Sequence, residues 1–329
     1  MEEISYEEFV YQFVAELQLK LSPYDMQVSI VNKMRNNSIL EKSIKVDIPG
    51  TNVSPSISTL PLYEHCCDCD DMPAVVRSLA EKIVEERDRQ IDTMSVLSKE
   101  NILKSTYLMV VNTAGNKALL ADTPHFLIAE GELAAIPRLS INIGGKKGSI
   151  IIKNGMLPVL QMTGEEILRV GKNNMVEQNL FEINSLLAET MRLMDEKGED
   201  ISDDFSEFFV ENTPKTFVIT TKDKKLGACC LACPEVIGTA IDKMGFDCYI
   251  LPSSIHEVIL VEKKGNANEI EELRDMVNQV NRQSVPANEI LSDQVFQYNS
   301  KTRKIEIAHT EQELKEMPEA PHKNRGLHM

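Results

Sequence analysis

The chain lacks tryptophan, and aromatic residues make up only 5% of its 329 residues. Glycine and proline are also sparse, at 15 and 14 residues, which excludes collagen-like and proline-rich chains. No apolar run reaches the ~18 residues that a membrane-spanning helix needs. Hydrophobic residues nevertheless account for 42% of the chain. Most of it is therefore expected to fold, as one large domain or two modest ones.

Basic residues are outnumbered by acidic ones. The chain has 35 lysines and arginines against 51 aspartates and glutamates, which gives a formal net charge of −16. A surface of this charge repels phosphate groups. Binding to nucleic acid or to an anionic membrane is therefore not expected.

The N-terminus and the cysteines both indicate where the protein is located. Residues 1–21 carry acids where a secretory signal needs a basic start, and their apolar residues are spaced rather than continuous. The seven cysteines are an odd number, grouped at 66–69 and 229–233 with Cys248 apart, which fits reduced thiols better than a set of disulfides. A cytoplasmic location is expected.

Hydrophobic periodicity and turn residues predict both helices and strands. Helices are expected where apolar residues recur every three or four positions, and strands where they alternate or run between turn residues. The predicted helices cover 5–21, 72–97, 113–121, 163–176, 181–196, 234–244 and 268–282. The predicted strands cover 27–34, 39–48, 54–62, 106–112, 126–128, 139–143, 149–153, 216–221, 227–231, 248–251, 258–261, 294–298 and 304–307.

Capping residues support several of these boundaries. Ser5 and Glu8 have the spacing of a capping box. Asp71 precedes Pro73 and has the position of an N-cap, because proline is tolerated in the first turn of a helix. Gly245 has the position of a C-cap, where a left-handed backbone favours glycine.

The order of the elements predicts the fold class. Neighbouring strands are joined by short turns more often than by helices, so we expect an α+β fold with mostly antiparallel sheets, packed helices and two domains. Residues 198–213 are rich in acids and are predicted to link an N-terminal domain, 1–197, to a C-terminal domain, 214–309. A subdivision of the first domain near residue 100 is left open. Residues 310–329 are expected to be a flexible tail.

Two groups of cysteines raise the question of a metal. His65, Cys66 and Cys69 lie close together, and Cys230 with Cys233 forms a second C-x-x-C pair. Thiolates and imidazoles at such spacings bind zinc. The pairs are far apart in sequence, however, and the second lies in an apolar run where cysteine serves as a small core residue. It also has only part of the pattern of a redox motif. No metal site is expected, and these five residues are the candidates if one exists.

The segment 252–261, PSSIHEVILV, gathers residue types that hydrolases use. In an extended backbone His256 and Glu257 point to opposite faces, so they cannot act as base and partner in one local triad. The H-E-x-x-H pattern of zinc peptidases fails because Leu260 occupies the second histidine position. His256 is therefore expected to be structural, or to line a binding site with Ser253 or Ser254.

Four segments of the chain carry a family resemblance: VNKMRNNSIL, NVSPSIST, FVITTKDKKLGACCLACP and YILPSSIHEVILVE. Through them, and over about residues 9–307, the chain resembles an uncharacterised bacterial family, DUF5688. The cysteines at 65–69 and 229–233 depart from the family pattern, which argues further against a metal. The C-terminal half is more loosely similar to a second uncharacterised family, UPF-0354. Neither resemblance implies an activity, a cofactor or catalytic residues, and the first implies an association with mobile elements.

No complete catalytic or cofactor-binding pattern passes these spacing tests. The sequence therefore favours a non-catalytic interaction or accessory protein without a cofactor, with a protein as the expected partner. Whether a small molecule binds is left open. The alternative is a hydrolase-type enzyme in which His256 joins a distant carboxylate, with Ser254, Glu257 or His125 as further candidates. A cleft that gathers His256 with such a carboxylate would favour the enzyme, and an exposed apolar patch would favour a protein partner.

Overall fold

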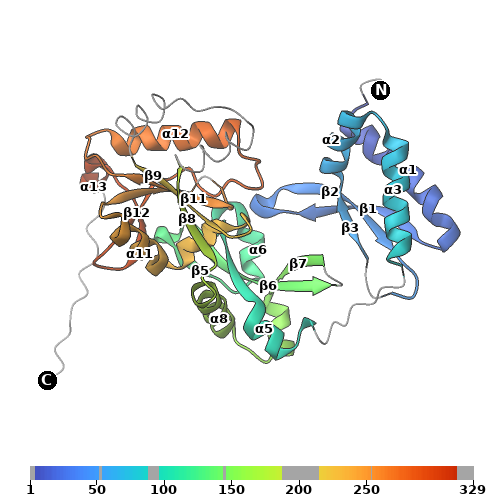
Figure 1. Ribbon diagram of the computed structural model, residues 1–329, viewed down its shortest axis with the longest axis horizontal. Helices are drawn as coiled ribbons and strands as arrows, with labels where there is room; N and C mark the ends of the chain where they lie inside the picture. The colour runs from blue at the N-terminus through green and yellow to red at the C-terminus, as the bar shows by residue number, and fades with distance from the viewer. Residues whose placement is uncertain are drawn as a thin grey trace.

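The computed structural model describes residues 4–51, 54–87, 96–143, 146–186, 215–252 and 254–316 (Figure 1). The α-helices in these ranges are α1 (Tyr6–Leu21), α2 (Thr59–Cys69), α3 (Met72–Glu85), α5 (Lys99–Ser105), α6 (Lys117–Ala121), α7 (Leu157–Leu160), α8 (Gly164–Glu177), α11 (Pro234–Met244), α12 (Glu269–Gln283) and α13 (Glu311–Glu316). Their strands form three sheets, and every described strand pair is antiparallel. The α+β fold class is confirmed.

Residues 4–87 form an N-terminal lobe with a core of its own. Its sheet has the order β1 (Gln27–Met34), β2 (Leu40–Asp47), β3 (Ser56–Ser58), and helices α1, α2 and α3 lie beside it (Figure 1). Phe9 and Phe13 of α1 are fully buried in this core. The core forms because α1 and α3 each carry an apolar stripe that only packing can remove from water.

The predicted caps are present at three helix ends. Ser5 and Glu8 form the reciprocal hydrogen bonds of a capping box at the start of α1. Asp71 Oδ1 accepts a hydrogen bond of 2.9 Å from the amide of Ala74 at the start of α3. Gly245 ends α11 with a φ of 77°. These ends could be predicted because a cap depends on local residues alone.

Residues 96–316 form the main body, which contains two sheets. The middle sheet has strands β4 (Thr106–Asn112), β5 (Phe126–Ile128), β6 (Leu133–Ile143) and β7 (Lys146–Ile151). The C-terminal sheet has the order β13 (Lys304–Ile307), β12 (Phe296–Asn299), β10 (Cys248–Leu251), β11 (Glu257–Glu262), β9 (Thr216–Thr221), β8 (Phe181–Ser185). Helices α11 and α12 lie on either side of the C-terminal sheet (Figure 1).

A buried 3₁₀-helix, η6 (Gly227–Ala232), contacts both sheets of the main body. All six of its residues are buried, and it contacts β4 of the middle sheet, β9 and β11 of the C-terminal sheet, and helix α11. The prediction of a strand at 227–231 is therefore wrong. A short apolar run fits a buried strand and a buried helix equally well, so periodicity could not decide between them.

Three other predicted elements are corrected. A helix was predicted over 181–196, but residues 181–185 form strand β8, which pairs with β9. The rest of that prediction beyond residue 186 lies outside the described residues. The predicted strand at 54–62 ends at Ser58, where α2 begins. Residues 311–316 of the predicted flexible tail form α13, which is attached because Arg274 pairs with Glu313 at 3.0 Å.

The predicted linker, 198–213, lies outside the described residues, so the division at this position stays a prediction. The C-terminal sheet and the main core include residues from both sides of it. The lobe's core contains no residue beyond 84, and the core clusters of the main body begin at Val96, so the two parts have separate cores; the subdivision near residue 100 stays a prediction. No helix in the described part of the chain has the length and hydropathy to cross a membrane.

The hairpin of β1 and β2 reaches from the lobe to the main body (Figure 1). Its turn, η2 (Asn36–Ser38), carries Asn37 in the left-handed region at φ 58°. Asn37 Nδ2 donates hydrogen bonds to Ala287 O at 2.9 Å and Ile290 O at 2.7 Å. Its amide donates to Asn116 Oδ1 at 3.0 Å, and Asn116 Nδ2 donates back to Asn37 Oδ1 at 3.1 Å.

The residues on either side of Asn37 extend this contact. Asn36 Nδ2 donates to Asn288 O at 3.0 Å, and Ser38 Oγ donates to Gly115 O at 2.7 Å. The turn therefore lies between two loops of the main body and bonds to both. It belongs to the segment VNKMRNNSIL, which carries part of the family resemblance.

Candidate functional site

His256, the leading candidate from the sequence, precedes β11 and is held on both sides of its ring. The amide of Leu226 donates a hydrogen bond to His256 Nδ1 at 3.2 Å. Because Nδ1 accepts, Nε2 carries the proton of the neutral ring, and it faces Glu289 Oε1 at 3.5 Å. The side chain is 32% exposed. Both ring nitrogens thus face groups of the protein itself.

The backbone of His256 is engaged as well. Its carbonyl accepts hydrogen bonds of 2.9 Å from the amide of Gly227 and from Thr220 Oγ1. Its amide donates to Ser254 Oγ at 2.9 Å. His256 therefore ties the start of η6 to strands β9 and β11.

The other hydrolase candidates do not complete a triad. Ser254 is buried, and its Oγ bonds to the backbone of His256 rather than to the ring. Glu257 is exposed on β11 opposite Thr220. Ser253 lies outside the described residues. The histidine of a triad uses one ring nitrogen to bond its carboxylate and the other to take the proton of the nucleophile. In His256, Nε2 faces Glu289, and Nδ1 already accepts the backbone N–H of Leu226.

Glu289, the carboxylate beside His256, was missed by the sequence reasoning. It lies in the loop before Ile290, and the amide of Ile255 donates to Glu289 O at 2.9 Å. An isolated bridge between Ser254 and Ile290 holds the same two segments together. No local spacing could predict this pair, because the two segments are separated by β11 and α12.

Replacement of His256 by alanine is expected to destabilise the protein by ~1–3 kcal/mol, because the partly buried amide of Leu226 loses its acceptor. His256→Asn places an oxygen near the position of Nδ1 and should recover most of this loss. Urea unfolding of the three proteins, followed by circular dichroism, measures the difference. Equal midpoints for the wild type and His256→Ala would contradict a structural role.

The metal candidates lie in two separate cores. Cys66 is buried in the lobe's core, where burial raises the pKa of its thiol to about 11, and His65 and Cys69 are exposed. Cys230 and Cys233 are buried in the main core. Across the described residues, no three histidine, cysteine, aspartate or glutamate side chains are grouped so that they could hold a metal ion.

Burial also sets the reactivity of the thiols, because only the thiolate attacks. It raises the pKa of the Cys233 and Cys248 thiols to about 12, and that of Cys230 well above its ordinary value. Cys67 and Cys69 are the two exposed cysteines.

A disulfide reagent such as Ellman's reagent is therefore expected to titrate two thiols rapidly in the native protein. All seven should react once urea unfolds the chain. Mass spectrometry of the modified peptides identifies the residues. Rapid native labelling of Cys230 or Cys233 would contradict their burial.

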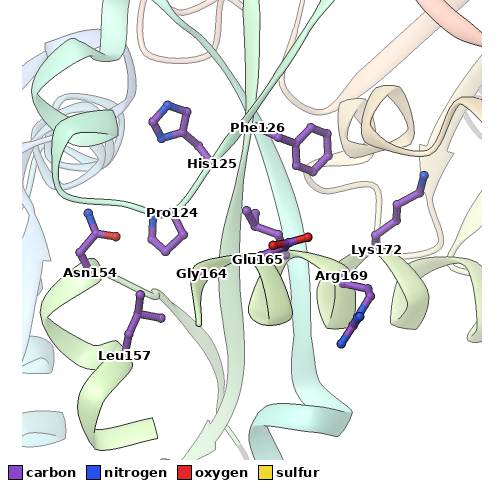
Figure 2. A pocket seen from close by; sticks show the side chains of 10 residues that line it. Pro124, His125, Phe126, Asn154, Leu157, Gly164, Glu165, Arg169 and Lys172 are labelled. Carbon is purple, nitrogen blue, oxygen red and sulfur yellow. The ribbon is translucent and has the colours of Figure 1, made fainter. Parts of the chain in front are cut away.

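A cleft of about 570 Å³ contains His125, the remaining histidine candidate. Figure 2 shows His125 and Phe126 on one side and Glu165, Arg169 and Lys172 along α8. His125 Nδ1 donates to Thr123 O at 2.9 Å, which leaves Nε2 as an acceptor. The full lining is Pro124, His125, Phe126, Asn154, Leu157, Gly164, Glu165, Leu168, Arg169 and Lys172.

The charges of this cleft are mixed. The lining combines Glu165 with the cations Arg169 and Lys172, and Lys172 pairs with Glu235 at 3.2 Å. Among the described residues that line it there is no serine, threonine or cysteine that could act as a nucleophile beside His125. The cleft can accept a small molecule by shape, but its groups do not define a reaction.

Comparison with known proteins places the chain in a family. A family model described as a family of unknown function, DUF5688, matches residues 6–300. The protein therefore belongs to this family, and the resemblance found in the sequence is confirmed. No curated protein and no solved structure matched the chain. The looser similarity to UPF-0354 stays a prediction.

Proposed function

We propose that the protein is a cytoplasmic, non-catalytic interaction protein that binds a partner polypeptide along the outer edge of β1. The observation that carries this proposal is the open backbone of that edge. β1 is the first strand of the lobe's sheet and pairs with β2 on one side. An edge strand of this kind is a template for the addition of an extended peptide.

The side chain of Gln18 shows which backbone groups of β1 face outward. Gln18 Nε2 donates to Met26 O at 3.1 Å, and the amide of Val28 donates to Gln18 Oε1 at 2.7 Å. Outward-facing groups recur at every second residue of a strand. Those of Ile30, Asn32 and Met34 therefore face away from β2, and within the described ranges they have no hydrogen-bond partner.

The side chains near this edge favour a protein partner. Met34 and Leu40 lie opposite each other in the β1–β2 register and are 58% and 65% exposed, and Ile39 is exposed beside them. Lys33 is the only charged residue of β1. Edge strands that avoid pairing usually carry more charge or a proline. Exposed apolar side chains beside an open edge can contact those of an added strand.

The surroundings of His256 support the non-catalytic part of the proposal. Leu226 N–H and Glu289 occupy the two sides of the ring, so neither nitrogen is placed to take a proton from a nucleophile. These groups instead hold η6 in the main core. The hydrolase alternative therefore lacks a supporting observation at this site.

Asn32→Pro tests the proposal, because it removes one outward N–H and leaves the hydrogen bonds between β1 and β2 in place. Asn32→Ala is the matched control, which keeps the N–H. Each tagged protein is crosslinked in lysate of the native host, and captured proteins are quantified by mass spectrometry. We expect the captured amount of at least one partner to fall about tenfold with the proline variant and to stay at the wild-type level with the alanine variant.

Circular dichroism and thermal unfolding must first show that both variants keep the wild-type fold. If every captured protein is retained equally by the proline variant, binding along β1 is wrong. If the folded wild type captures nothing above an untagged control, the interaction function itself is wrong.

A further inference from the structure

A second cavity, of about 270 Å³, lies at one end of the C-terminal sheet. It is separate from the His125 cleft and from the edge of β1. Its lining includes Asp247 and Cys248 at the start of β10, Lys263 just after β11, and Gln297 and Tyr298 of β12. Most of these lining residues are polar, and the amine of Lys263 is half-buried.

The amine of Lys263 is held in one position. Lys263 Nζ donates to Gln297 Oε1 at 2.9 Å and lies 4.6 Å from the centre of the Tyr249 ring. Tyr249 and Gln297 are partners in the β10–β12 register, so they lie on the same face of the sheet. The backbone amide of Lys263 also donates to Asp247 O at 2.8 Å. The amine thus has two fixed contacts, and one of them, Gln297, lines the cavity together with Lys263.

Burial changes the acidity of this amine. It lowers the pKa of Lys263, and the nearby charges of Asp247 and Glu269 oppose the shift without reversing it. The carboxylate of Glu269 is itself engaged, because the amides of Lys264 and Gly265 donate to it. More of the Lys263 side chain is therefore neutral near pH 8 than an exposed lysine would be, and only the neutral amine is a nucleophile.

We propose that Lys263 is a reactive amine that binds a small aldehyde or ketone as an imine in this cavity. The nitrogen lone pair attacks the carbonyl carbon, the C=O π electrons move to oxygen, and a proton passes from nitrogen to oxygen to form a carbinolamine. The hydroxyl group then leaves as water together with the remaining N–H proton, and the nitrogen electron pair forms the C=N bond. The step needs no oxidant or reductant.

Lys264 provides a control within the same molecule, because it is the next residue and its side chain is exposed. The folded full-length protein is treated at pH 7.5 with acetaldehyde at a low molar ratio, and sodium cyanoborohydride reduces each imine to a stable ethylamine. Peptide mass spectrometry measures the rate of modification at each lysine. We expect Lys263 to react at least about fivefold faster than Lys264.

Unfolding tests whether the cavity causes this difference. In 8 M urea (about the concentration that unfolds most domains) the two rates should become similar, because the burial and the fixed contacts of Lys263 are lost. Equal or slower reaction of Lys263 in the folded protein would overturn the proposal. A preference of the same size in urea would also overturn it, because the cause would then be local sequence and not the cavity.

Discussion

Replacement of Gly227 by alanine is expected to cost more than ~3 kcal/mol of stability, or to prevent folding. A Cβ atom at this position would lie 2.4 Å from His256 O and 2.5 Å from Thr220 Cα. Both are backbone atoms of packed strands and loops, so neither can move without breaking the hydrogen bonds that hold η6. Overpacking of a fully formed core is among the costliest changes that a single residue can make.

Urea unfolding and the yield of soluble protein measure the effect of Gly227→Ala. Gly155→Ala is the matched control, because a Cβ atom there meets nothing within 4 Å. Its unfolding free energy should stay within ~0.5 kcal/mol of the wild type. A folded Gly227→Ala protein with the wild-type midpoint would show that η6 does not pack against His256 as described.

Replacement of Asn37 by glycine is expected to loosen the contact between the lobe and the main body. Glycine tolerates the φ of 58°, so the change reports mainly on the lost side chain. That side chain donates to Ala287 O and Ile290 O and accepts from Asn116. With ~1 kcal/mol for each net hydrogen bond, the loss should be ~2–3 kcal/mol.

Hydrogen exchange measures where this loss occurs. Amides of residues 113–116 and 287–290 should exchange faster in Asn37→Gly, and those of the lobe's core around Phe9 should be unchanged. Ser29→Ala, an exposed change on β1, is the control. Faster exchange throughout the lobe would mean that the turn stabilises the lobe itself and does not serve mainly as its attachment.

Much of the local structure could be predicted because it depends on neighbouring residues. The helix starts at Ser5 and Asp71 follow from side chains that bond to amides three residues away. The β1–β2 hairpin follows from two strand-like segments around Asn36 and Asn37, since asparagine tolerates left-handed backbone. The regular alternation of short strands and turns predicted antiparallel sheets, and this was correct.

Two of the errors have different local causes. The run from Gly227 to Cys233 is apolar at nearly every position because all of η6 is buried, so it carries no periodic signal. Residues 181–185 were predicted to begin a helix because apolar residues continue at helical spacing as far as Met194, but they pair with β9 as the edge strand β8. In both cases the answer depended on which strands lie beside the segment.

Spacings within a few residues were enough to predict the fold class, the position of most helices and strands, and the lack of a local catalytic triad. The contact of Glu289 with His256, the place of β1 at a sheet edge and the cavity beside Lys263 could be found only from the folded chain. These features depend on contacts between segments distant in the chain, and chain packing selects such contacts without leaving a local pattern.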